Sequence, residues 1–237
     1  MIFLTKRKVD LLLFLSLTGF LMVIYGCDKE NHPQDQIVDS RDGNVYRIVS
    51  IGKQVWMAEN LKYLPAVTGP EEGSRTSPHY YVYGYDGTNV NEAKTTENYR
   101  TYGVLYNWSA AMNSCPTGWH LPSYEEWEDL IYFLGGIEVA GDKLKEKGHI
   151  HWNRLPKTEA TNETGFTALP GGHRSQGSEF LYMGDYTGWW STREGNDVHE
   201  EGENYPSWFI SVDSWTPRVY IFPLFKDFGN SVRCLRN

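Results

Sequence analysis

Few residues of this 237-residue sequence have the types and spacing that catalysis or metal binding requires. The common signatures of a nucleophile elbow, a zinc protease, a phosphate loop and a dinucleotide fold are all absent. The closest pair of histidines, His149 and His151, has the spacing of two ligands on one strand face. Two ligands do not make a metal site, so we interpret both as surface polar residues and the chain as non-catalytic.

Aromatic side chains late in the sequence are better candidates for function. Rigid rings bind proteins and the apolar faces of sugars with little loss of conformational entropy. Trp189 and Trp190 are adjacent in an expected strand, so one ring should face the core and its neighbour should face outward. The predicted ligand-binding set is Trp190, Tyr205, Trp208, Trp215 and Tyr220.

Short strands must position these rings. Alternating residues from Val45 to Ile51, with bends at Asp42-Gly43 and Gly52-Lys53, predict a small antiparallel meander. Proline and glycine throughout residues 65–98 predict a long loop without regular elements. From His149 onward we expect short strands and loops, and the closing strands are Trp208–Val212, Arg218–Phe222 and Ser231–Leu235.

Two to three helices are expected between the two groups of strands. Helical spacing predicts one from near Gly103 to Cys115. Ser123 with Glu126 forms a capping-box pattern that predicts a second, ending before Gly135-Gly136, and a third spans Val139 to Lys145. The fold class is therefore α+β, with short antiparallel strands and long loops. We expect core packing, rather than ligand stacking, for Trp56, Trp108, Trp119 and Trp127.

The composition excludes one class of partner. The chain has 22 Lys and Arg against 30 Asp and Glu, a net charge of −8. Binding to nucleic acid depends on a positive surface that meets the phosphate backbone, so we expect no nucleic-acid partner.

The N-terminus has the features of a secretory signal. Basic residues Lys6–Lys8 precede the apolar run Leu11–Ile24, which is shorter than the ~20 residues that span a bilayer. The segment Ile24–Cys27 resembles the lipobox of bacterial lipoprotein precursors, which implies cleavage before Cys27 and lipidation of its sulfur. An ordinary signal peptide with an incidental cysteine is the alternative.

These features divide the chain into a signal peptide (residues 1–26), a lipidated cysteine with a flexible tether (27–36) and a folded domain (37–237). The expected location is the bacterial cell envelope, with the lipid in the outer membrane as the membrane partner. The acidic start after Cys27 resembles surface-export signals of some lipoproteins, which implies display on the cell surface.

If Cys27 is lipidated, Cys115 and Cys234 remain as an even pair in an exported protein. Oxidising surroundings favour a disulfide between them. Two free thiols or a redox pair are the alternative, although the sequence has no Cys-x-x-Cys that would lower a thiol pKa.

Several ordered strings carry a family resemblance, and they lie at Asp42–Tyr46, Trp56–Leu61, Tyr102–Trp108, Cys115–Ser123, Thr161–Gly172 and Ser231–Arg236. Together they resemble the Fibrobacter succinogenes major paralogous domain family, from about Asp39 to the C-terminus. The resemblance implies an exported domain, often on lipoproteins, with a fold similar to C-type lectins and sulfatase-modifying factors. It implies a fold and a location rather than an activity.

Two properties of proteins with that fold bear on this sequence. A sulfatase-modifying enzyme needs a reactive cysteine pair, whereas both cysteines of the domain are expected to form the disulfide. Calcium-dependent lectins carry Glu-Pro-Asn or Gln-Pro-Asp and Trp-Asn-Asp strings, which this sequence lacks. Its acidic stretch offers only weak calcium candidates, and more often such a stretch is a solvated loop, so we expect no cofactor. Those candidates are Glu194, Asp197 and Glu200.

The leading hypothesis is therefore a lipid-anchored envelope protein whose lectin-like domain binds a glycan or a protein without catalysis. The alternative is a structural envelope or adhesin-associated protein without a small ligand. An enzyme related to sulfatase-modifying factors is the third hypothesis.

Overall fold

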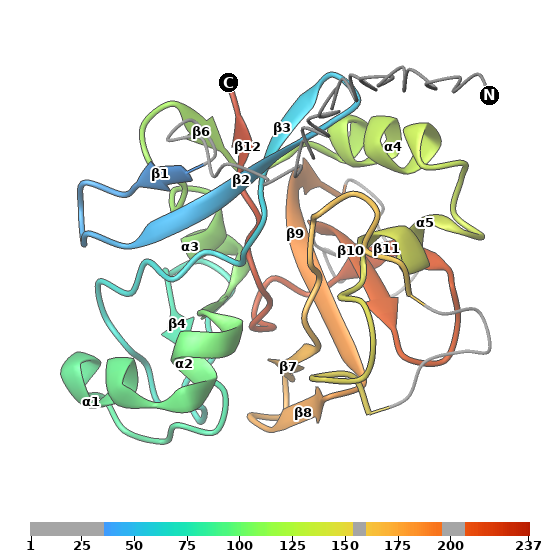
Figure 1. Ribbon diagram of the computed structural model, residues 1–237. Helices are drawn as coiled ribbons and strands as arrows, with labels where there is room; N and C mark the ends of the chain where they lie inside the picture. Colours follow the sequence, from blue (N-terminus) through green and yellow to red (C-terminus); the bar gives the residue numbers. More distant parts are fainter. Residues whose placement is uncertain (1–35, 154–159, 196–206) are drawn as a thin grey trace, which may run out of the picture. The chain divides into compact units, whose positions relative to one another are not determined.

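The computed structural model describes residues 36–153, 160–195 and 207–237 (Figure 1). The predicted signal peptide, the lipidation site Cys27 and all of the tether except Gln36 lie outside these residues, as do Tyr205, Asp197 and Glu200. Within the described ranges, no helix combines the length and apolarity needed to cross a bilayer.

An antiparallel sheet of five strands joins the two ends of the domain. Its order is β1 (Gln36–Val38), β2 (Val45–Ile51), β3 (Gln54–Met57), β12 (Leu235–Arg236) and β6 (Trp119–His120). The first three strands form the predicted meander, with Gly43 and Gly52 at positive φ in its turns. The last strand of the chain, β12, pairs with β3 on one side and with β6 on the other (Figure 1). The C-terminal residues are therefore needed to join β6 to the rest of the sheet.

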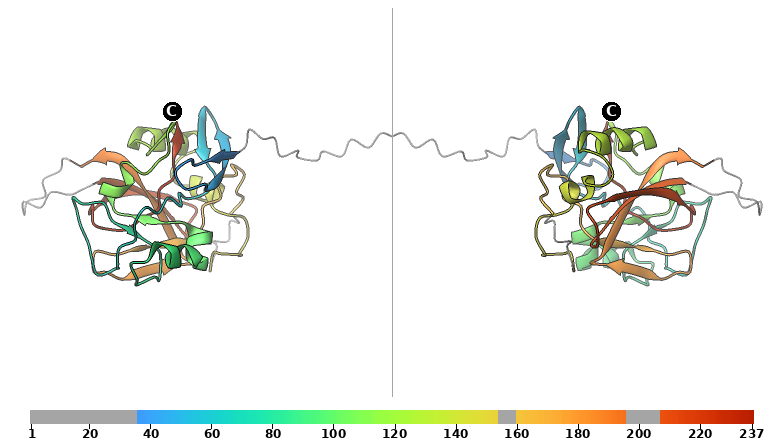
Figure 2. Two further views of the ribbon diagram at one scale, coloured as in Figure 1. Left: turned by 90° about the vertical axis from the view of Figure 1, so that its left-hand side faces the viewer. Right: turned by 90° about the vertical axis from the view of Figure 1, so that its right-hand side faces the viewer.

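A second antiparallel sheet has the order β11 (Val219–Leu224), β10 (Ser207–Asp213) and β9 (Tyr186–Glu194), and Figure 2 shows it from two sides. The predicted strands at 208–212 and 218–222 match β10 and β11 closely. Of the strand predicted at 231–235, only its last residue belongs to β12. Two short antiparallel pairs complete the described strands: β4 (Tyr80–Tyr81) with β5 (Leu105–Tyr106), and the hairpin of β7 (Gly171–Arg174) with β8 (Phe180–Met183).

The helix α4 (Tyr124–Phe133) forms as its capping box predicts. The Ser123 hydroxyl accepts the Glu126 N–H at 3.1 Å, and the Glu126 carboxylate accepts the Ser123 N–H at 2.7 Å. Its apolar face buries Trp127, Leu130 and Ile131. The short helix α5 (Ala140–Leu144) also lies where the sequence predicts a helix.

The prediction of a structureless loop over residues 65–98 is wrong. That range contains β4, the helix α1 (Val90–Thr95) and the start of α2 (Glu97–Tyr102). Both helices are only six residues long, so neither shows a helical period in the sequence. Their caps carry the signal, because the side chains of Asn89 and Thr96 accept backbone N–H groups of the first turns.

The helix predicted from Gly103 starts later than expected. Leu105 and Tyr106 form a strand, and Tyr106 exchanges backbone hydrogen bonds with Asn230 at 2.7 and 2.9 Å. The helix α3 (Trp108–Ala111) begins only after Asn107, whose side chain caps it. The described residues thus contain five short helices rather than two or three.

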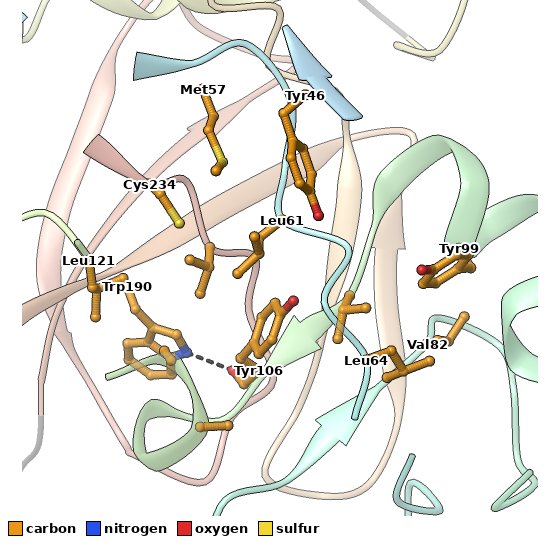
Figure 3. Close-up of a cluster of buried hydrophobic side chains, with 14 of the residues drawn as sticks. Tyr46, Met57, Leu61, Leu64, Val82, Tyr99, Tyr106, Leu121, Trp190 and Cys234 are labelled. Atoms are coloured by element: carbon orange, nitrogen blue, oxygen red, sulfur yellow. Dashed lines mark hydrogen bonds between the residues drawn. The ribbon is translucent and has the colours of Figure 1, made fainter. Parts of the chain in front are cut away.

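Two apolar cores lie on opposite faces of the second sheet. The first gathers around Tyr106 and includes Tyr46, Leu61 and Trp190 (Figure 3). The second contains Trp56, Trp127, Phe166 and Trp189, with ring centroids 4.6 to 6.1 Å apart. Of the four tryptophans predicted to pack in the core, Trp56, Trp119 and Trp127 are buried and Trp108 is half-buried.

The adjacent rings of Trp189 and Trp190 show the effect of a sheet covered on both faces. Both are fully buried, so the prediction that Trp190 faces solvent is wrong. The two rings do point to opposite faces, but each face packs against a core. Trp190 donates its indole N–H to the Tyr106 carbonyl at 2.7 Å (Figure 3).

A buried polar network spans the region where the two cores meet. The Asn60 side-chain oxygen accepts from Trp189 Nε1 at 3.0 Å and from Arg233 Nη2 at 2.8 Å. Arg233 Nε donates to the same oxygen at 3.2 Å, and Nη1 donates to the backbone carbonyls of Met57 and Phe166. Burial lowers the pKa of Arg233 to about 9. One amide therefore orients a core tryptophan and solvates a buried cation.

Cys115 and Cys234 are joined by a disulfide, with Cα atoms 5.9 Å apart and 119 positions between them in the sequence. This confirms the predicted pair. It fastens the segment after α3 to the start of β12.

Replacing both cysteines by serine should lower the free energy of unfolding by about 4–5 kcal/mol, because the cross-link closes a loop of more than 100 residues. Guanidinium unfolding of the oxidised full-length chain and of the double variant measures the difference. Equal stability of the two would contradict a structural disulfide.

Asn60→Ala should cost at least about 3 kcal/mol, since it leaves a buried guanidinium and a buried indole N–H without their acceptor. The control is Asn91→Ala, which removes an exposed amide on α1 and should change stability little. Comparable urea midpoints for the two variants would refute the role assigned to Asn60.

Candidate binding site: an aromatic cleft

Strand register places one set of side chains together on the second sheet. Ser211 pairs with Gly188 and with Tyr220, and Asp213 pairs with Tyr186. Residues directly opposite in antiparallel strands share a face, so Tyr186, Ser211, Asp213 and Tyr220 point to the same side. The other side, with Ile210 and Val212, belongs to the second core.

Over this face lies a cleft of about 480 Å³. The β7–β8 hairpin, the turn after β10 and the segment after β11 form its walls. Most of the lining is aromatic, and it consists of His173, Tyr182, Tyr186, Ser211, Asp213, Trp215, Tyr220, Phe222, Leu224 and Phe228.

The inner end of the cleft depends on Gly188. A β-carbon at this position would overlap the ring of Phe209, so only glycine allows the ring to lie across β9. Phe209 stacks on Tyr186 at 6.3 Å and meets Phe222 edge-on at 5.4 Å. These contacts connect the cleft to the first core, to which Phe209 belongs.

The turn after β10 presents Trp215, whose side chain is 50% exposed. Asp213 Oδ1 accepts the backbone N–H groups of Trp215 and Thr216, both at 2.9 Å. The Thr216 hydroxyl lies 3.0 Å from that of Tyr220. One carboxylate oxygen thus fixes the turn that carries Trp215, the tryptophan that lines the cleft.

A buried lysine braces the same turn. Lys145 is fully buried, forms an ion pair with Asp142 at 2.8 Å and donates to the carbonyls of Asp213 and Thr216 at 3.0 and 2.8 Å. Because bonds to a charged donor are stronger than neutral ones, this contact holds the turn against α5.

Burial favours the neutral forms of two titratable rings in the cleft, His173 and Tyr186. His173 lies 5.5 to 5.8 Å from the rings of Tyr182, Tyr186 and Phe228, and burial lowers its pKa to about 4. Burial also raises the pKa of Tyr186. At neutral pH both rings can therefore exchange hydrogen bonds with a ligand without carrying charge.

Tyr182 occupies a strained backbone position at the rim. Its φ is 60°, in the left-handed region that aromatic residues rarely adopt, and its side chain is 54% exposed. Strain of this kind costs about 1–3 kcal/mol and gathers at functional sites. This backbone conformation places the exposed Tyr182 side chain in the lining of the cleft.

The structure brings together two of the predicted ligand-binding residues, Trp215 and Tyr220. Trp190 lies in the core. Trp208 lies on the opposite face, where its half-buried ring packs against Tyr124 at 5.2 Å and beneath Arg193 at 5.3 Å. Tyr205 lies outside the described residues.

Sequence reasoning missed the wall formed by His173, Tyr182, Tyr186 and Phe228. Phe222 belongs to the late aromatic cluster of the sequence, and its alternation with Tyr220 and Leu224 was a usable signal for one face of β11. The other four residues gave no such signal. His173 and Tyr182 lie in strands of four residues, Tyr186 precedes the late cluster, and Phe228 lies between β11 and β12.

The weak metal candidates do not form a site in the described part of the chain. The Glu194 carboxylate pairs with the Lys226 ammonium, and Asp197 and Glu200 lie outside the described residues. His149 is exposed, whereas His151 pairs with Glu146 at 2.8 Å. In the ranges 36–153, 160–195 and 207–237, no group of three or more His, Cys, Asp or Glu side chains could hold a metal ion.

Stability should fall as the pH drops from 6.5 toward 4, because His173 stays neutral in the folded state while its unfolded form takes up a proton. The lower pKa of folded His173 reduces the free energy of unfolding by about 3 kcal/mol at pH 4 and leaves it unchanged well above the unfolded pKa. Urea unfolding at several pH values should show a weaker dependence in His173→Gln than in the control His149→Gln. Identical pH profiles would contradict the buried neutral histidine.

Comparison with known proteins adds one finding. Neither a curated protein nor a solved structure matches the chain. A family model, the Fibrobacter succinogenes major domain, matches residues 49–236. The match begins within β2 and ends within β12, and it includes every residue that lines the cleft. The chain therefore belongs to the Fibrobacter succinogenes major domain family.

Proposed function

We propose that this domain is a non-catalytic binding module whose aromatic cleft holds a glycan, on a protein anchored to the bacterial envelope by a lipid at Cys27. The observation that carries the proposal is the cleft itself, in which exposed Trp215 and Tyr182 face neutral polar groups.

The shape and chemistry of the cleft suit a sugar. Its volume of about 480 Å³ is in the range of small-ligand pockets. The rings offer flat apolar surfaces for the C–H faces of a pyranose, and His173 and the Tyr220 hydroxyl offer hydrogen bonds for its hydroxyl groups. Its described lining includes the Asp213 carboxylate and no Lys or Arg side chain, so the cleft favours neutral over anionic ligands.

Binding without catalysis is the better interpretation of the carboxylates. Hydrolysis of a glycoside generally uses two carboxyl groups that flank the scissile bond. Within the described residues that line the cleft, Asp213 supplies one, and its Oδ1 is already bonded to the backbone of its own turn. Such a group holds structure in place rather than transferring a proton to a ligand.

The lectin-like part of the proposal rests on the sequence resemblance and on a β-rich α+β domain with short antiparallel strands. The lipid anchor rests on the lipobox-like segment that ends at Cys27. Both agree with a disulfide-bonded domain, because disulfides persist in exported proteins.

One observation favours the alternative of a structural envelope protein. Apolar side chains at and after the end of α4 are exposed, with Tyr132 at 87%, Phe133 at 62% and Ile137 at 42%. Exposed apolar groups of this kind mark protein contacts. Fixed co-purification with an envelope protein, together with no glycan binding, would select this alternative.

Trp215→Ala should weaken glycan binding about tenfold or more, since exposed tryptophans that anchor a ligand contribute more than 1 kcal/mol. Trp208→Ala is the matched control: it removes a tryptophan from the other face and should leave the affinity unchanged. The measurement is a glycan array with the full-length chain in detergent, followed by calorimetry on the hits.

The array is run with calcium and again with a chelator. We expect the same hits in both, because the cleft binds through rings and neutral polar groups. Loss of all hits in chelator would contradict binding through the cleft alone, and equal affinity of Trp215→Ala and the wild type would remove the cleft as the binding site.

A further inference from the structure

A second pocket, of about 320 Å³, lies apart from the aromatic residues and is lined mainly by charged and polar side chains. Its walls come from β2, the segment 58–62, α2, residues 167–169 and the approach to β12. The charged residues of this basic pocket are Arg47, Glu59, Lys62, Arg100 and Arg233.

The positive charges of the basic pocket exceed its negative ones. Arg47 and Lys62 share a single carboxylate, that of Glu59, at 3.3 and 3.4 Å. Burial raises the pKa of Glu59, but Lys62 and Arg47 outweigh this and hold it below its usual value, so the carboxylate is ionised. Four cations therefore surround one anion, on a chain whose net charge is −8.

Two of the four cations have no carboxylate partner among the described residues. Arg100 is exposed and forms no ion pair there. Arg233 is only 1% exposed, and its neighbours are carbonyl oxygens and the Asn60 amide rather than an acid. The Glu59 carboxylate acts on Arg233 without pairing with it. A buried charge with no acid in direct contact remains able to attract an anion, since the interior screens it less than water does.

Arg233 also has an unused donor. Its guanidinium has five N–H groups, of which Nη1 uses two, on Met57 and Phe166, and Nε uses one, on Asn60. Nη2 makes one bond to Asn60, so one Nη2 hydrogen has no partner within the described residues. Thr101 lines the same pocket and can add a hydroxyl donor.

We propose that the basic pocket binds an oxyanion group, a sulfate, phosphate or carboxylate, with Arg100 and Arg47 at its mouth and Arg233 at its base. Guanidinium groups pair with such oxyanions through two parallel N–H bonds, which makes arginine the residue suited to this recognition. The pocket would thus give the domain a second, charged contact with an acidic ligand, independent of the aromatic cleft.

The test is calorimetric titration of the full-length chain in detergent with sodium sulfate, inorganic phosphate and sodium glucuronate, at an ionic strength held constant with chloride. The first two anions probe a tetrahedral group and the third a planar carboxylate on a sugar. We expect saturable binding of at least one, and in Arg100→Gln a dissociation constant about tenfold higher, as loss of a bond to a charged group implies.

Lys53→Gln is the charge-matched control, because it removes one exposed positive charge at the turn between β2 and β3, outside the pocket lining. It should bind as the wild type does, and so should Trp215→Ala, which alters only the aromatic cleft. Equal binding by Arg100→Gln and the wild type would overturn the proposal, as would the absence of any anion binding above chloride. Melting temperatures of all variants identify any that fail to fold.

Discussion

The side-chain oxygen of Asn60 is the point on which the rest of this domain depends. It accepts from Trp189 in the second sheet and from Arg233 just before the last strand, while its own amide donates to the Tyr102 carbonyl. Segments more than 100 positions apart meet at this single side chain. Because each partner is buried, an unsatisfied donor would be costly, so the network disfavours arrangements of the two cores that break these bonds.

The packing around Asn60 also explains how the sheet of β9, β10 and β11 can carry the candidate binding cleft. Trp189 and Trp190 pack into different cores, so the inner part of the sheet is covered on both sides. Toward Asp213 one face loses its cover, and the rings left there line the cleft. The sheet is thus packed on both faces over most of its length, and near Asp213 one face is open and aromatic. Lys145 and Asp213 hold the turn beside this open face.

The two candidate sites differ in their electrostatics. In the aromatic cleft, burial keeps His173 and Tyr186 neutral, so contact area and neutral hydrogen bonds dominate. In the basic pocket, arginine and lysine outnumber the one carboxylate, so charge dominates. A glycan that carries an acidic substituent would suit both kinds of contact, whereas a neutral glycan would suit only the cleft.

The sequence by itself determined the features that depend on neighbours in the chain: the meander over β1–β3, the capping box of α4, the α+β class and the family. It also indicated Cys115 with Cys234, since the pair was even. Only the tertiary structure decided which faces are covered. Trp190 and Trp215 are the same residue type, yet one is buried and the other half exposed, because burial depends on what packs over a strand. The same reason hid His173 and Tyr186, which become neighbours only through folding.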